Sequence, residues 1–183
     1  MDQNANQDYK VFGGLLLVWY WCLIIGGILA LLTMVIPALL SIAVSFLIGI
    51  VYLVGILISI ITVCISAAFY IKAAIQLKAR NLQFFDTYVN GILITFAGAI
   101  ASSLLTITSI AGIGNFIGSV VGSIFGLAIG LGLSIMYFSK SVRVNTYFGE
   151  RPVQKSRYWN WIKLLPSFIT SETMPDPNNL QNK

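Results

Sequence analysis

Few side chains in this sequence are able to do chemistry inside its long apolar segments. Asp86 is the only acid between Lys10 and Lys140, and Asn90 follows it by one helical turn on the same face. A carboxylate inside a membrane is typical of proton or cation transport. Asp86 is expected at the cytoplasmic end of the third span, however, and is better explained as an acid in the first helical turn, where its negative charge interacts favourably with the helix dipole. In that interpretation it pairs with Lys78 or Arg80.

The sequence contains few residue combinations that could carry out catalysis. There is no histidine, no cluster of carboxylates, no nucleophile beside a base and no phosphate-binding loop. Cys22 and Cys64 both fall within apolar runs, so they are predicted to be small buried hydrophobes. Two cysteines without a histidine do not make a zinc site. The sequence therefore predicts no catalytic, cofactor-binding or metal site, and we expect the protein not to be an enzyme.

The composition predicts a membrane protein. Hydrophobic residues make up 57% of the chain and charged residues only 9%, whereas soluble domains carry roughly 25% charged residues. Residues 11–71 and 87–139 contain no charge, and each segment is far longer than the roughly 20 residues that cross a bilayer as a helix. The net charge of +5 comes from cations beside the ends of these segments. They are expected to face lipid headgroups rather than nucleic acid.

Each charge-free segment has room for two helices, so we expect an all-α protein with four transmembrane helices. Proline disfavours helical geometry in the residue before it, so Pro37 predicts a turn after Ile36. Residues 37–46 form either a short interfacial piece or part of a tilted second span. The glycine-rich Ala111–Asn115 predicts the turn before the fourth span. The expected organisation is an N-terminal tail (1–10), a four-helix domain (11–138, with spans at about 11–36, 46–72, 86–110 and 116–138), a basic segment with an amphipathic helix (139–168) and a disordered tail (169–183).

The cations predict how the chain threads through the membrane. They cluster near Lys10, near Lys78 and after Lys140, while the turns near Pro37 and near 112–115 carry none. Because basic residues resist translocation, both termini are predicted to be cytoplasmic.

Several residues at the end of the fourth span and after it are predicted to anchor the protein at the membrane surface. Tyrosine keeps its ring in the apolar zone and its hydroxyl in the wet zone, while cations bind headgroups. The segment "SRYWNWIKLLP" (156–166) is amphipathic, which favours a helix lying on the inner leaflet. Docking onto a cytoplasmic partner is the alternative. The expected anchors are Tyr137, Lys140, Arg143, Trp159 and Trp161; the apolar face of the tail helix is Tyr158, Trp161, Ile162 and Leu165, and its polar face is Arg157, Asn160 and Lys163.

The fourth span carries a row of glycines at four-residue spacing: Gly118, Gly122, Gly126 and Gly130. Such a row forms a shallow groove that lets a second helix backbone approach closely. Packing within the chain is the favoured interpretation, because small residues in the third span, such as Gly98 and Ser102, have the same spacing. A homo-oligomer or a partner membrane protein is the alternative.

Two stretches resemble a known family. "VFGGLLLVWYW" (11–21) and "YFSKSVRVNTYF" (137–148) are similar to the DUF2569 family of small bacterial membrane proteins, with Ser141, Arg143 and Val144 matching its second motif. Leu15 stands where the family has tryptophan, and Thr146 comes one residue early. The resemblance covers most of the chain and implies a four-helix protein of the bacterial cytoplasmic (inner) membrane, without an established activity.

The sequence favours a non-enzymatic accessory or assembly subunit that acts through helix–helix contacts in the lipid bilayer. A small solute or ion carrier or channel, dimeric in one version, is the alternative, with Asp86 and Asn90 at its cytoplasmic entrance. Composition alone is also compatible with a four-span vesicle protein of a eukaryote.

Overall fold

The computed structural model describes residues 12–36, 38–42, 49–105, 107 and 110–164. Among these residues, four helices are long and apolar enough to cross a membrane, which confirms the predicted all-helical, multi-pass build. The predicted terminal tails, 1–10 and 169–183, lie outside the described residues. The helices are α2 (Leu15–Ala30), continued by the π-helix η1 (Leu31–Val35), α4 (Ile50–Lys78), α5 (Phe84–Leu105), α6 (Ile110–Lys140), α7 (Val142–Phe148), α8 (Pro152–Lys155) and α9 (Trp159–Ile162).

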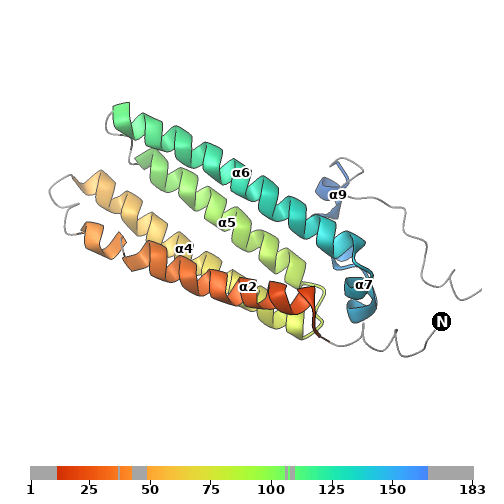
Figure 1. Cartoon of the computed structure of the whole chain (residues 1–183). Helices are drawn as coiled ribbons and strands as arrows, with labels where there is room; N and C mark the ends of the chain where they lie inside the picture. The colour runs from red at the N-terminus through yellow and green to blue at the C-terminus, as the bar shows by residue number, and fades with distance from the viewer. Residues whose placement is uncertain (1–11, 37, 43–48, 106, 108–109, 165–183) are drawn as a thin grey trace, which may run out of the picture.

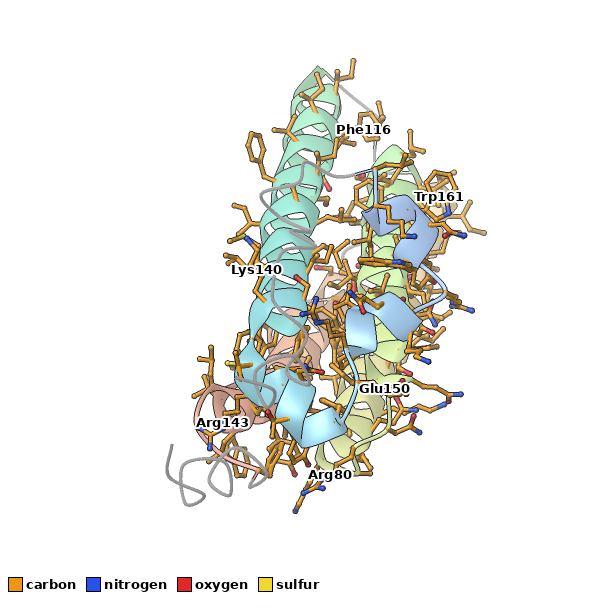
Figure 2. The ribbon with its side chains drawn as sticks, turned by 90° about the vertical axis from the view of Figure 1, so that its right-hand side faces the viewer. Arg80, Phe116, Lys140, Arg143, Glu150 and Trp161 are labelled. Carbon is orange, nitrogen blue, oxygen red and sulfur yellow. The ribbon has the colours of Figure 1, made fainter. Side chains whose placement is uncertain are left out.

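The long helices lie side by side in the order α2, α4, α5, α6 (Figure 1). α4 packs against both α2 and α5, while α6 packs mainly against α5. The short helix α8 fits against the ends of α5 and α6, and α9 follows it. Figure 2 views the molecule from this end, where Arg80, Lys140 and Arg143 are labelled.

The hydrophobic core is concentrated at this same end. It contains the large rings of Phe84, Phe85 and Phe138, which are all at most 1% exposed. Phe84 and Phe138 have ring centroids 4.9 Å apart at a 63° interplanar angle, an edge-to-face geometry that aromatic pairs prefer. By contrast, no described residue of α6 from Phe116 to Leu133 is buried by the rest of the chain. In a bilayer this exposure is stable, because lipid tails cover apolar side chains as well as protein does.

The residues on either side of Pro37 are helical and show no sign of the turn that was predicted there. Ile36 has helical angles (φ −62°, ψ −53°), residues 38–42 are helical, and a membrane-length helix runs over Leu15–Ile42. Pro37 itself lies outside the described residues, as do 43–48, so the course of 37–46 is described only in part. The π-helix Leu31–Val35 stands directly before the proline.

The glycine-rich turn predicted at Ala111–Asn115 is wrong. α5 ends at Leu105 and α6 already begins at Ile110, so the glycines lie in the first turns of α6. Glycine costs about 1 kcal/mol in a helix relative to alanine. In lipid, leaving backbone groups without hydrogen bonds costs several kcal/mol each, so the helix is retained through glycine.

Candidate functional site

The glycine row of α6 has no partner among the described residues. A Cβ built on Gly118, Gly122, Gly126 or Gly130 meets no atom within 4 Å. The intramolecular packing that the sequence favoured for this face is therefore not seen in the described structure. The face remains open along the lipid-exposed part of α6.

The expected mate in the third span packs elsewhere. A Cβ built on Gly98 of α5 would lie 2.0 Å from Cγ2 of Thr62 and 2.6 Å from its Cβ. Thr62 belongs to α4, so the small residue lets α4 and α5 approach each other rather than letting α6 approach α5. Helix faces made of small residues are the ones that permit such close contact in membranes.

A groove of about 430 Å³ opens between α2 and α6, above α4 and α5. Its walls carry small residues from both outer helices, and its floor carries hydroxyls and aromatic rings. The wall residues include Cys22, Gly26 and Gly27 of α2 and Ser123, Gly126 and Gly130 of α6; the floor includes Tyr70 of α4 and Tyr88 and Thr95 of α5.

The floor hydroxyls are paired with one another. Tyr70 and Thr95 lie 3.3 Å apart and join α4 to α5. Tyr88 and Ser134 lie 2.9 Å apart and join α5 to α6, and Ser134 also donates to the carbonyl of Gly130. Pairing removes the penalty of placing these groups in a water-poor environment. The hydroxyls therefore hold the helices together at the base of the groove.

Aromatic rings close one end of the groove. Trp19 of α2 stacks on Tyr137 of α6, with centroids 6.3 Å apart and planes 13° apart. Trp19 also contacts Phe138 (5.4 Å) and Tyr88 (6.0 Å). Tyr137, which the sequence predicted as a headgroup anchor, is thus packed against the first span. These ring contacts join α2 to the last turns of α6.

Arg143 and Lys140 were also predicted as anchors. The side chain of Arg143 is partly buried and packs against the protein rather than extending from it. Its guanidinium sits against Gly13 and Gly14 at the start of α2. Lys140 is the last residue of α6 and is partly exposed. Tyr147 of α7 donates to the carbonyl of Lys78 (2.9 Å), which places the cation-bearing ends of α4 and α6 at one end of the bundle.

Asp86 and Asn90 both bind the C-terminal segment. The Asp86 carboxylate accepts a hydrogen bond from Ser156, a partner that the sequence did not predict. Asn90 Oδ1 accepts from both Arg157 and the Tyr158 hydroxyl. Its two neighbours also contact each other, since Arg157 donates to Tyr158 at 2.9 Å. Sequence spacing offered no signal for these contacts across about 70 residues.

The helix α9, which lies within the predicted amphipathic segment 156–166, distributes its apolar residues differently from the prediction. Ile162 is only 6% exposed, while Trp161 is 74% exposed. The sequence put both on one face, whereas in the structure Ile162 faces the protein and Trp161 faces outward. Trp159 packs partly against the core and has the Lys163 ammonium 5.5 Å above its ring. Leu165, expected on the same face, lies outside the described residues.

Cys22 and Cys64 are free and exposed, so the prediction that other parts of the chain bury them is wrong. Both lie on membrane-length helices, where lipid supplies the apolar environment that the sequence pattern indicates.

No protein-family model, curated protein or solved structure matches the chain. The resemblance to the DUF2569 family stays a prediction.

Proposed function

We propose that this protein is a non-enzymatic accessory or assembly subunit that acts by binding another transmembrane helix on the glycine face of α6. The observation that carries the proposal is the lack of any described atom within 4 Å of a Cβ built on Gly118, Gly122, Gly126 or Gly130.

The chemistry of this face suits a helix. Without Cβ atoms, two backbones approach closely enough for extensive van der Waals contact and for Cα–H hydrogen bonds, the forces that associate helices in lipid. Gly126 and Gly130 also line the groove between α2 and α6. A helix seated on the glycines would therefore fill a space that the described chain leaves open.

In the proposed orientation, the protein lies in a bacterial inner membrane with both termini on the cytoplasmic side. It is supported by the contact between Tyr147 and Lys78, which brings the cations at the end of α4 to the same end as those after α6. A single basic end is what the resistance of cations to translocation requires. The bacterial membrane comes from the family resemblance.

The proposal is tested by affinity purification of the full chain in mild detergent, followed by mass spectrometry and by measurement of the mass of the purified particle. We expect a stoichiometric partner or a second copy of the chain. A monodisperse monomer without a membrane-protein partner would contradict the proposal.

A small carrier is the second candidate, favoured by the groove of about 430 Å³ and by the hydroxyls of its floor. In such a carrier, Asp86 would be the acidic residue at the cytoplasmic entrance of the transport path. Its test is solute or ion flux in liposomes with Asp86→Asn as the variant. Equal flux through wild type and variant would remove Asp86 from any such path.

A further inference from the structure

The C-terminal segment of the described chain is fastened to α5 at two levels. Val153 of α8 is fully buried, and the hydroxyl of Ser156 donates to Asp86. One turn further along α5, Asn90 accepts from Arg157 and Tyr158. Burial and hydrogen bonds together define where α9 lies.

The length of α5 indicates how deep α9 lies in a bilayer. At 22 residues, α5 is roughly 33 Å long, close to the roughly 30 Å of the hydrocarbon core. Both of its ends therefore lie near the boundaries of that core. Asn90 is six residues into the helix, or about 9 Å from its first residue. A segment that is hydrogen-bonded to Asn90 lies at the level of lipid rather than in open water.

The outward face of α9 fits this level. Trp161 is 74% exposed and Leu164, three residues later, is 78% exposed. On a soluble surface this pair would be an unfavourable apolar patch, but at the boundary of the acyl chains it is stabilised by burial in lipid. Lys163 lies over the Trp159 ring, and its long stem lets the ammonium reach the headgroups.

We propose that α9 is a docked membrane wedge. Asp86 and Asn90 hold Ser156–Tyr158 against α5, and this attachment directs Trp161 and Leu164 into the lipid leaflet at the basic end of the protein. The partner of this surface is the bilayer itself. Asp86 and Asn90 are positioning residues for the wedge.

The immersion of the wedge is measured on the full-length protein in vesicles of phosphatidylcholine and phosphatidylglycerol, in a Cys22→Ala, Cys64→Ala background. A nitroxide is placed at Trp161→Cys, at Leu164→Cys or, as the water reference, at Glu150→Cys. We expect the first two labels to collide more with oxygen and several-fold less with a water-soluble nickel complex than the reference does. Equal nickel access at all three positions overturns the wedge and favours a soluble protein as the partner of this face.

The attachment is measured separately through the motion of the label at Leu164→Cys. Asn90→Ala removes the acceptor of two hydrogen bonds, so we expect faster nitroxide motion. The control is Asn145→Ala, because Asn145 is not a partner of residues 156–158. An unchanged spectrum in Asn90→Ala overturns the positioning role. Neither measurement needs a partner helix. A negative result for the wedge therefore does not affect the proposed function of the α6 glycine face, and a negative result for that face does not affect the wedge.

Discussion

Nη1 of Arg143 lies 2.5 Å from the position that a Cβ on Gly14 would occupy. The contact joins the beginning of α2 to α7, two segments that are far apart in the sequence. Phe12 and Tyr147 meet beside it with centroids 5.6 Å apart. The two stretches that carry the family resemblance are therefore one structural unit, in which the missing side chain of a glycine makes room for a guanidinium.

The first prediction concerns Gly14. Its φ of +58° combined with ψ of −136° lies outside the regions allowed to a residue with a Cβ, and the new methyl group would collide with Arg143. We expect Gly14→Ala to lower the free energy of unfolding by about 1–3 kcal/mol, measured as an earlier thermal transition in detergent. Gly26→Ala is the control, because nothing lies within 4 Å of a Cβ there. Equal transitions for both variants would contradict the account of this contact.

The second prediction concerns the close contact of α4 and α5. Gly98→Ala would drive a methyl group into Thr62, and overpacking of this kind costs about 1–3 kcal/mol. Thr62→Ala should restore only part of the stability, since the Thr62 Cβ at 2.6 Å remains. Gly118→Ala, on the open face of α6, should have little effect. Thermal unfolding of the two single variants and the double variant measures the coupling, and strictly additive effects would argue against direct contact.

The third prediction concerns the α6 glycine face. Gly122→Leu combined with Gly126→Leu should abolish co-purification with a second copy or partner while leaving the folded monomer intact, because a Cβ at either position meets no described atom of a neighbouring element within 4 Å and the groove beside Gly126 has a volume of about 430 Å³. Ala128→Leu adds the same kind of bulk to a different face of the helix. Retained association in the double variant, or equal loss in the Ala128 control, would place the interface elsewhere.

The fourth prediction concerns orientation. Compartment-specific reporters inserted after Leu105, between α5 and α6, and fused after Lys183 should report from opposite sides of the membrane. The physical reason is that the α5–α6 connection carries no charge, while the segments at the other end of these helices carry the cations. Reports from one and the same side would overturn the proposed threading.

Four apolar helices follow from the amino-acid sequence alone, because residues 11–71 and 87–139 contain no charge and an uncharged chain in lipid must satisfy its own backbone hydrogen bonds. The same requirement explains why the turn predicted at 111–115 did not form. Glycines such as those of 112–114 end helices in water, where solvent can bind the freed backbone groups, but lipid offers no such partner.

Which small residues meet, and where the C-terminal segment lies, becomes visible in the three-dimensional fold. In lipid, apolar faces gain little by contacting one another, so hydropathy does not reveal that Gly98 packs on Thr62 while Gly126 stays open. Likewise, the contacts of Asp86 and Asn90 with Ser156, Arg157 and Tyr158 depend on the turns after α6. Such pairings arise from the shapes of distant segments, and no local pattern in the sequence encodes them.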